Sequence, residues 1–536
     1  MSTAYLVLLI LLIVYIPIWV WVWRNPERAA RWHLQKYGPC IMIKTQLGMK
    51  TMDRFARYPR FWHAFGFCSK LISAVLFLLM MYMLIVAVIA IPSRLASGSS
   101  IGIEYALAIP GFNPIMPLSY GVVALFFAMV VHELGHGIQA RVNGIHVDSS
   151  GLLYGVVPLG AFVEPNEEEM ATKPRKAQID VYAAGITVNT VFAVISIILM
   201  VFACSFVSSD YGDSAGVYYV DADSPAYDAG IPASALIIGI SDADGNLLVG
   251  TDVNGNQNGT LSTVTSGSAA YIDYPLDPTQ RYYVTYMLED GTHQSGLVQL
   301  GLYIKAVTSG SGANNAGITA GSFIYSITIN GTTTKIDGYQ TFTDLMSSTS
   351  GGEQIVVTTV SVMDSEGTYT TTDYDVTLST RNSIGFLGVT TTMSGLTFTT
   401  PDLLMEAAVN PFYNVSTPYS YVTSLFSYLS GPFNGMDPIS DEVKWWYDAP
   451  GGDLTWVFIK LMYWIFWLDI LLAISNALPT YVLDGGFIFA GGVNWFLEKL
   501  RIGDEERRRK LTDSIAGSVS TVVLFLFLLV ILAMVV

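Results

Sequence analysis

The stretch Val131-His132-Glu133-Leu134-Gly135-His136-Gly137 determines how this chain is interpreted, because it sets two histidines and a glutamate in apolar sequence. The preceding residues, 120–131, read Y-G-V-V-A-L-F-F-A-M-V-V and predict a helix that is apolar all round. On a helix, His132 and His136 are one turn apart and point the same way, with Glu133 beside them. The pattern H-E-x-x-H therefore predicts a Zn²⁺ site with two imidazole ligands and Glu133 as the general base.

The alternative is a chance pattern in which both histidines are hydrogen-bonded core groups. The chain has six histidines, so this pattern is rare by chance. Two imidazoles and a carboxylate are also costly inside a bilayer unless they have partners. The zinc interpretation is favoured, because zinc lowers the pKa of a bound water to about 7 and a carboxylate can take that water's proton as it attacks a carbonyl.

The composition indicates an integral membrane protein. The chain has 536 residues, of which 51% are hydrophobic and only 13% charged, and its mean hydropathy is +0.45. Its net charge of −16 argues against a nucleic-acid partner. The three cysteines show no pairing pattern, so we expect no disulfide framework.

Six apolar stretches predict an α-helical polytopic protein with about six transmembrane helices. The predicted spans are 4–23, 71–92, 117–141, 179–206, 454–478 and 514–536, with a short apolar helix at 484–500. The first lacks the basic start and the cleavage site of a signal peptide, so we expect a retained anchor. Between the fourth and fifth spans, residues 207–454 hold five Lys or Arg against 26 Asp or Glu and alternate apolar with polar residues, which predicts an inserted β-rich region.

The distribution of basic residues predicts the orientation. Twenty of the 27 Lys and Arg residues fall in 24–70, 141–176 and 499–510, and six spans place all three segments on one side of the membrane. By the positive-inside rule this side is cytoplasmic. We therefore expect a multi-pass protein of the cell membrane with an extracytoplasmic region at 207–453 and with His132 and His136 near the cytoplasmic side.

A catalytic zinc needs a third protein ligand, and Asp484 is the best candidate. It lies in Asn476-Ala477-Leu478-Pro479-Thr480-Tyr481-Val482-Leu483-Asp484-Gly485-Gly486, at the predicted depth of the two histidines. A carboxylate at that depth needs a cation, and Pro479 with the two glycines would break the helix. The alternative is that Asp484 is the N-cap of the next helix.

These motifs together resemble the site-2 protease family of intramembrane metalloproteases. His132-Glu133-Leu134-Gly135-His136 and Asn-x-x-Pro-x-x-x-Leu-Asp-Gly-Gly match its two metal motifs, and Gly185-Ile186-Thr187-Val188-Asn189 matches its Gly-x-x-x-Asn helix. Residues 151–165 resemble the loop that follows the metal helix. The resemblance covers about residues 117–206 and 454–500. Ile186 and Ala477 stand where many members have proline, which affects the subfamily rather than the chemistry.

The resemblance implies that His132, His136 and Asp484 bind zinc, that Glu133 is the catalytic base, and that Asn189 and Asn476 position the substrate. The alternative for both asparagines is hydrogen bonding between helices. It also implies cleavage of single-span membrane proteins within or near their transmembrane helix, and the loop Val156–Val163 is a candidate to hold the unwound segment as an added strand.

Two stretches of the inserted region resemble the helix–turn–strand signature of PDZ domains. They are Ser224-Pro225-Ala226-Tyr227-Asp228-Ala229-Gly230-Ile231 and Ser311-Gly312-Ala313-Asn314-Asn315-Ala316-Gly317-Ile318, each followed by an apolar strand. The second continues with a predicted helix at 342–346 and a strand at 354–360. The first stretch matches the PDZ signature less well than the second. Insertion of one PDZ-like domain in the other is one of the open arrangements. A PDZ-like domain here would bind peptides or screen substrates, and a β domain without a ligand is the alternative.

The sequence thus predicts an intramembrane zinc protease gated by PDZ-like domains, with transmembrane proteins and the lipid bilayer as partners. A catalytically inactive adaptor that binds peptides is the alternative, although the intact motif argues against it. A transporter is less favoured, because the spans show no paired repeat. The predicted divisions are 1–116 (N-terminal anchor, basic loop, second span), 117–206 and 454–500 (catalytic core), 207–400 (PDZ-like region), 401–453 (linker) and 501–536 (loop and last span).

Overall fold

The computed structural model describes residues 3–97, 110, 113–155, 158–266, 269–381, 384–413, 415, 417–431 and 439–535, with side chains in the first helix described from Leu12 onward. The chain forms two compact units. The first unit consists of residues 1–203, 429–435 and 454–536, and the second of residues 204–428 and 436–453.

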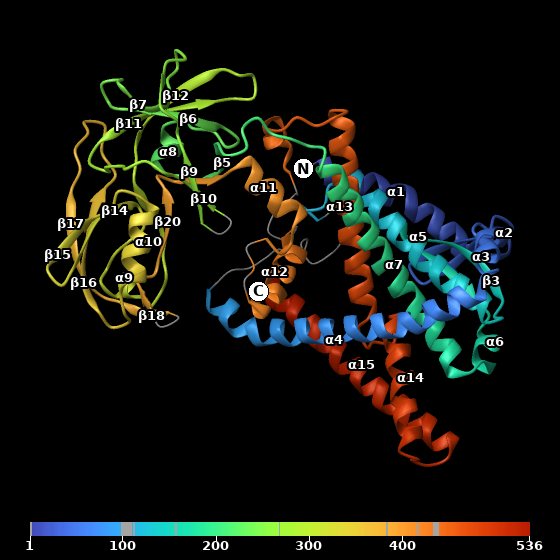
Figure 1. The fold of residues 1–536 in the computed structure, drawn as a ribbon. Helices are drawn as coiled ribbons and strands as arrows, with labels where there is room; N and C mark the ends of the chain where they lie inside the picture. The colour runs from blue at the N-terminus through green and yellow to red at the C-terminus, as the bar shows by residue number, and fades with distance from the viewer. Residues whose placement is uncertain are drawn as a thin grey trace. The chain divides into compact units, whose positions relative to one another are not determined.

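The first unit is mainly helical (Figure 1). Five of its helices are long and apolar enough to cross a membrane, at Pro59–Pro92, Leu118–Val142, Arg175–Cys204, Asp453–Asn476 and Glu505–Ala533. Its helices are α1 (Thr3–Arg24), α2 (Pro26–Arg31), α3 (Met49–Phe55), α4 (Pro59–Ser97), α5 (Leu118–Val142), α6 (Glu167–Thr172), α7 (Arg175–Cys204), α13 (Asp453–Asn476), α14 (Asp484–Lys499) and α15 (Glu505–Val535). The prediction of a polytopic membrane protein is confirmed.

The helix limits differ from the predicted spans mainly at α4 and α15. Both helices begin well before the apolar run, and α4 starts at Pro59, a residue suited to the first helical position. No glycine pair or proline interrupts residues 60–70, so the helix continues beyond the predicted start at Leu71. The predicted first span falls on α1, whose described apolar part is Leu12–Arg24; its side chains before Leu12 lie outside the described ones.

Helices α5, α7 and α13, which include the segments of the predicted catalytic core, pack together in the first unit (Figure 1). Gly135 of α5 permits the close approach of α7, because a Cβ atom there would lie 3.0 Å from the Ala184 carbonyl oxygen. Ile186 of α7 shares a buried apolar cluster with Ala473 and Ile474 of α13. Small residues at such contacts are typical of helix packing in membranes.

A four-stranded antiparallel sheet accompanies these helices, in the order β1-β2-β3-β4. Its strands are β1 (Leu34–Tyr37), β2 (Cys40–Thr45), β3 (Val147–Tyr154) and β4 (Pro158–Pro165). The Lys44 ammonium group of β2 lies 2.8 Å from the Glu164 carboxylate of β4. Burial alone would raise the pKa of Glu164, but hydrogen bonds from Lys44 and Ser149 outweigh it and hold that pKa below its ordinary value. Residues 156 and 157 of the predicted substrate-holding loop lie outside the described residues.

The second unit is rich in strands, which confirms the inserted β-rich region. Its strands are β5 (Ala215–Val220), β6 (Leu236–Ser241), β7 (Leu247–Thr251), β8 (Gln257–Asn258), β9 (Thr263–Ser266), β10 (Ala269–Ile272), β11 (Arg281–Met287), β12 (His293–Gln299), β13 (Leu302–Val307), β14 (Ser322–Ile329), β15 (Thr332–Lys335), β16 (Gln354–Ser361), β17 (Thr371–Thr377), β18 (Ser379–Arg381), β19 (Ile384–Phe386), β20 (Val389–Met393) and β21 (Leu396–Thr399). Its helices are α8 (Pro225–Asp228), α9 (Gly312–Asn315), α10 (Tyr339–Ser347), α11 (Pro401–Val409) and the 3₁₀ helix η3 (Asp441–Trp446), while α12 (Pro418–Ser430) ends in the first unit.

Two apolar cores divide this region into two lobes. The first lobe comprises residues 215–300 and 396–399, whose buried side chains include Val217, Ile237 and Phe398. The second lobe comprises residues 302–393 and has its own core, although its last residue, Met393, packs in the core of the first lobe. Hence the second lobe is inserted between β12 and β21, the last two strands of the first lobe. Helix α10 and strand β16 match the elements predicted for the second PDZ-like copy, and the region is consistent with a PDZ-like fold.

The two lobes repeat one local design. Ser224 caps α8 by accepting a hydrogen bond from the Tyr227 N–H, and Ser311 caps α9 in the same way. Each cap packs against a glycine with positive φ that precedes the closing strand of its lobe. These glycines are Gly395 for the first lobe and Gly388 for the second. The internal similarity seen in the sequence is thus also a structural repeat.

The closing strands differ in what covers their outer edges. The Gly395 carbonyl accepts a hydrogen bond from the Asp221 N–H, on the side of β21 that faces β5. The backbone groups of successive strand residues point to alternate sides, so those of Phe398 point away from β5, where Phe398 pairs with Ala270 of β10. In the second lobe the Gly388 carbonyl accepts a hydrogen bond from the Thr308 N–H, which follows β13. By the same alternation the backbone groups of Val389 and Thr391 point away from β13. Both residues pair with β13, opposite Val307 and Ile304, and on its other side β20 pairs with β21 at Met393. Among the described residues no further strand pairs with that side of β20 at Val389 and Thr391, whereas β10 pairs with the corresponding side of β21.

Replacing Gly388 with alanine should destabilise the second lobe. Gly388 has a φ of +87°, and an added Cβ would lie 2.1 Å from the Ser311 Cβ. Backbone strain of about 1–3 kcal/mol adds to overpacking of similar size. Thermal unfolding of the purified protein, monitored by the onset of proteolytic cleavage between residues 302 and 393, should show a lower Tm for Gly388→Ala than for the wild type. Gly310→Ala is the control, since its φ is +73° but nothing lies within 4 Å; an equal loss in both variants would contradict the packing explanation.

Candidate metal centre

Helix α5 carries both predicted histidine ligands on one buried face. His132 and His136 are 6% and 8% exposed, and the intervening Gly135 lies on the same buried side. The helix continues to Val142, where Gly144 with a φ of +66° ends it. The predicted spacing of the histidines on one turn is therefore realised.

Asp484 lies in the first turn of α14, after the loop that follows α13. Leu483 is the N-cap residue, so the structure does not place Asp484 in the alternative N-cap role. Gly485 and Gly486 let the loop fold tightly onto this turn, because Cβ atoms there would lie 2.3 Å from the carbonyl oxygens of Leu478 and Thr480. Only glycine fits at either position, and the tight loop directs the Asp484 carboxylate toward α5.

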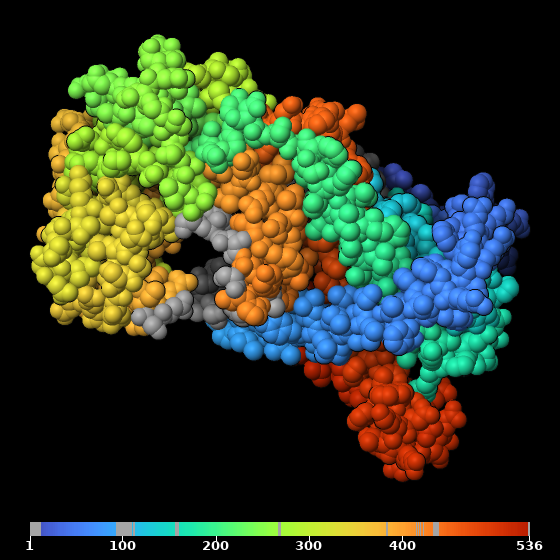
Figure 2. Space-filling model, viewed as in Figure 1, coloured from blue at the N-terminus to red at the C-terminus, as the bar shows by residue number. Residues whose placement is uncertain are grey.

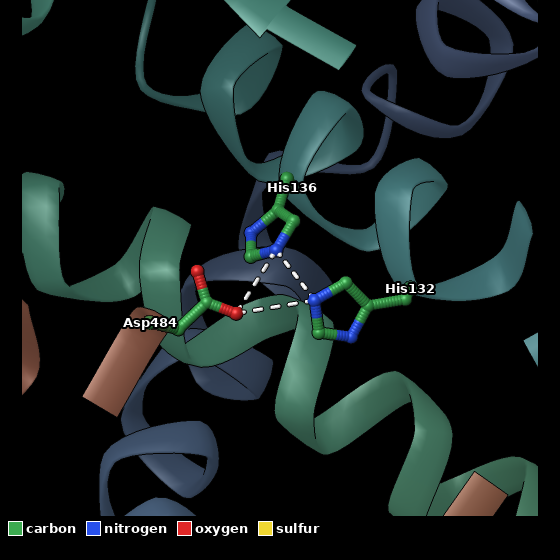
Figure 3. A group of neighbouring side chains, drawn as sticks. All are labelled: His132, His136 and Asp484. Atoms are coloured by element: carbon green, nitrogen blue, oxygen red, sulfur yellow. Dashed lines mark hydrogen bonds and ion pairs between the residues drawn. The ribbon is translucent and has the colours of Figure 1, made fainter. Parts of the chain in front are cut away.

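The three predicted ligands converge (Figure 3). The Nε2 atoms of His132 and His136 are 3.0 Å apart. The Asp484 Oδ2 atom lies 3.1 Å from the His132 Nε2 and 3.3 Å from the His136 Nε2. A tetrahedral Zn²⁺ with bonds of about 2.0–2.1 Å spaces its ligand atoms roughly 3.3 Å apart. The triangle therefore fits a zinc ion with a fourth position left for water or substrate.

Hydrogen bonding of His136 supports a metal as the missing partner. Its Nδ1 lies 2.8 Å from the Val181 carbonyl oxygen, which can only accept, so the proton is on Nδ1. In a neutral His136, the form that binds a metal, Nε2 then presents a lone pair toward Asp484. Within the described residues the Asp484 Oδ2 has no hydrogen-bond donor. Converging lone pairs repel one another unless a cation lies between them, and a carbonyl behind the imidazole is the usual second partner of a metal-bound histidine.

Gly185 of α7 forms the wall behind the imidazoles. A Cβ atom at this position would lie 2.4 Å from the His136 Nε2 and 2.8 Å from the His132 Cε1. Only glycine fits at the first position of the Gly-x-x-x-Asn stretch, because any larger side chain would displace the imidazoles.

Glu133, the predicted base, is held by strand β4. Its Oε2 accepts a hydrogen bond from the Val163 N–H at 2.8 Å. A carboxylate bonded through one oxygen keeps its other oxygen for a proton. The sequence places Glu133 next to His132, and the structure adds the strand that orients it.

The two predicted substrate-positioning asparagines have backbone partners. The buried Asn189 donates from Nδ2 to the Ala128 carbonyl of α5 at 3.3 Å, while its Oδ1 has no partner among the described residues. Asn476 donates to the Leu472 carbonyl of its own helix at 3.0 Å. The Asn189 contact is the interhelical bond of the alternative interpretation, and its free carbonyl oxygen leaves substrate contact as a prediction.

Sequence reasoning missed two backbone groups at this centre and one buried acidic residue elsewhere in α13. The Val181 carbonyl and the Val163 N–H are backbone groups, which no residue pattern reveals. Asp469 of α13 is fully buried, and neither carboxylate oxygen has a hydrogen-bond partner among the described residues. Its signal was present, since it is an acidic residue within the predicted span 454–478, and such residues in membrane helices are commonly functional.

The fold and the site define a class, a polytopic membrane protein with a histidine–histidine–aspartate group that could hold a metal ion, beside a helix-borne glutamate. A family model described as "Peptidase family M50" matches residues 120–507. The chain therefore belongs to peptidase family M50, the site-2 protease family of membrane metalloproteases. The predicted resemblance is confirmed.

Two relatives illustrate the similarity. The chain is 33% identical over 173 residues to the uncharacterized protein MJ0971 of Methanocaldococcus jannaschii, which covers 32% of this chain and 46% of the relative. It is 25% identical over 137 residues to a "membrane-bound transcription factor site-2 protease homolog" of Arabidopsis thaliana, covering 24% of this chain and 27% of the relative. The matches thus span less than half of either relative.

Zinc content should separate the roles of these residues. Asp484→Ala should lower bound zinc along with activity, whereas Glu133→Gln should keep the zinc and lose turnover, because a base is not a ligand. Gly185→Ala should lower zinc binding through its clash with His136, while Gly492→Ala, with nothing within 4 Å of its added Cβ, should not. Metal analysis of the purified variants decides this, and full occupancy in Asp484→Ala would remove that residue from the ligand set.

Proposed function

We propose that this protein is an intramembrane zinc metalloprotease that cleaves single-span membrane proteins within or near their transmembrane helix. The observation that carries the proposal is the convergence of the His132, His136 and Asp484 ligand atoms within 3.3 Å, with the neighbouring Glu133 oriented by β4. Membership of the M50 family supports the same reaction class.

The residues of this chain have separable roles in peptide-bond hydrolysis. His132, His136 and Asp484 would hold zinc, which supplies Lewis acidity for water attack on a carbonyl when it is bound. Glu133 takes the proton of the attacking water and returns it to the leaving amine. The hydrogen bond from Val163 fixes the carboxylate during both transfers. Asn189 is proposed to bind substrate through its unpartnered carbonyl oxygen.

Strand β4 is proposed to hold the unwound substrate. It is the last strand of its sheet, and within the described residues no strand pairs with its outer edge. The Val163 N–H points from that edge to Glu133, so by alternation the backbone groups of Ala161 face the same edge. A substrate segment added there would lie beside the base. A membrane helix hides its carbonyls in its own hydrogen bonds, so cleavage needs such an acceptor of extended chain.

The orientation predicted from the basic residues remains part of the proposal. The metal centre would lie near the cytoplasmic side of the cell membrane, and the second unit outside the cytoplasm. Products would then be released toward the cytoplasm, and preferred substrates would have helix-weakening residues near that end of their span.

The inserted lobes are proposed to gate access to the core. None of the ligands or the base lies in residues 207–400, so the lobes are not needed to build the metal centre. The side of β20 that faces away from β13 pairs with β21 only at Met393 among the described residues, so its backbone at Val389 and Thr391 is proposed to accept a substrate's extended tail as an added strand. A bulky folded domain offers no such tail and would be excluded.

Cysteine labelling tests the orientation. In a variant with the three native cysteines replaced, Glu366→Cys should react with a membrane-impermeant maleimide on intact cells, because this exposed residue lies in the second unit. Glu505→Cys, also exposed, should react only after lysis. The opposite pattern would overturn both the orientation and the proposed side of product release.

Excision of the second lobe tests protease function and gating together. Ser394 donates to the Gly301 carbonyl at 3.1 Å, so residues 302–393 can be replaced by a short linker that rejoins neighbouring backbone. The full-length enzyme should cut a single-span substrate with a minimal outer tail in detergent, and Glu133→Gln should not. The excised enzyme should cut a substrate with a bulky outer domain several-fold faster than the full-length enzyme does.

Each outcome of that experiment has a distinct meaning. If the full-length enzyme binds zinc but cuts neither substrate above the Glu133→Gln control, the proteolytic function is wrong. If excision abolishes cleavage of both substrates while zinc binding is kept, the second lobe presents substrates and the gating proposal is wrong.

A further inference from the structure

Residues 24–61 connect α1 to the apolar part of α4. Helix α1 ends at Arg24 after three tryptophans, of which Trp21 and Trp23 are 38% and 48% exposed. Tryptophan is enriched where a span meets the lipid headgroups. The segment 24–61, here called the interfacial segment, follows the predicted first span and leads into α4, which contains a candidate membrane span; we therefore expect it to lie close to the headgroups.

The interfacial segment is strongly basic on its exposed surface. Eight of its Lys and Arg residues are exposed: Arg24, Arg28, Arg31, Lys36, Lys50, Arg54, Arg57 and Arg60. It holds two acidic residues, Glu27 and Asp53, and Asp53 pairs with Arg141 of α5. None of the eight forms an ion pair with any residue that the structure describes. These charges are available to an external anion.

Large apolar side chains are exposed among these cations: Trp32, Tyr37, Leu47, Phe55, Tyr58 and Phe61. The segment, in dark to mid blue, lies at the surface in Figure 2. Cations interspersed with aromatic residues are typical of chains that lie in the membrane interface, where rings enter the acyl boundary and cations meet phosphates. A soluble acidic partner would satisfy the charges but not the exposed apolar rings.

We propose that the interfacial segment binds acidic phospholipid headgroups of the adjacent leaflet. Each Lys or Arg close to an anionic membrane surface contributes about 1 kcal/mol of attraction, so four or more acting together would enrich acidic lipid beside the protein. The segment lies outside residues 120–507, the part matched by the family model. The proposal does not depend on the proteolytic function.

Lipid bound to the interfacial segment would also stabilise α5, the helix that carries His132 and His136, because α3 packs against it. The outer side of α3 carries the exposed Lys50, Arg54 and Phe55, while its Met52 is 1% exposed. A Cβ atom at Gly137, the residue after His136, would lie 2.5 Å from the Met52 Sδ. Helix α3 thus sits between the lipid surface and the helix that carries the histidines.

Fluorescence quenching in nanodiscs tests the proposal on the full-length protein. Brominated phosphatidylglycerol or brominated phosphatidylcholine is included at equal mole fraction, and the Trp32 signal is obtained as the difference between the wild type and Trp32→Phe. Trp32 is 74% exposed, so this substitution leaves the packing intact. The proposal predicts several-fold stronger quenching of Trp32 by the acidic lipid, and weaker discrimination at high salt.

A matched pair of variants localises the effect. Replacing Arg28, Arg31, Arg54 and Arg57 with glutamine should abolish the preference for the acidic lipid. The control removes four charges elsewhere, by replacing residues 507–510 (Arg-Arg-Arg-Lys) with glutamine, and should keep the preference. Inorganic phosphate should reduce it no more than chloride does at the same ionic strength, which separates headgroup binding from a free-phosphate site.

Equal quenching of wild-type Trp32 by the two brominated lipids would overturn the proposal whether or not the variants fold. Equal loss of the preference in both four-charge variants would also overturn it, since the effect would then follow net charge rather than this surface. Absence of quenching by either lipid would show that the segment faces water and another partner.

Discussion

The arrangement of the whole first unit depends on one electrostatic constraint, the convergence of three lone-pair-bearing atoms in a membrane protein. The histidine nitrogens and the Asp484 oxygen lie within 3.3 Å of one another. With neutral imidazoles and no cation between these atoms the triangle is repulsive, and in lipid little water is available to relieve it. Three features keep these atoms in place. Gly185 leaves space for the imidazoles, the Val181 carbonyl accepts from His136, and Gly485 and Gly486 in the first turn of α14 let the preceding loop pack tightly.

The histidine pair and the base could be predicted from the sequence because their relation is local. Residues four apart on a helix share a face whatever surrounds them. Asp484 lies far away in the chain, and its selection needed the predicted depth of two spans together with the family resemblance. What places Asp484 against α5 is the packing of α7 and α13 and the tight loop on α14, which the residue pattern signals only through its proline and glycines.

The features that escaped prediction are those made by pairing between distant segments. Strand β2 comes from the N-terminal region and pairs with β3, so the sheet that reaches Glu133 through Val163 joins segments on both sides of α4 and α5. An alternating pattern predicts a strand but not its partner. For the lobes, the similarity was visible in Ser224 and Ser311 and insertion of one domain in the other was one of the open alternatives, whereas the strand that closes the first lobe, β21, was not identified.

The central claim is that His132, His136 and Asp484 together bind one zinc ion. X-ray absorption spectroscopy at the zinc edge of the purified full-length protein tests this most directly. The account predicts a four-coordinate zinc with nitrogen and oxygen neighbours at about 2.0–2.1 Å, two of them imidazoles, and the loss of one imidazole signature in His136→Ala. A sulfur neighbour, or a spectrum unchanged in both His136→Ala and Asp484→Ala, would contradict it.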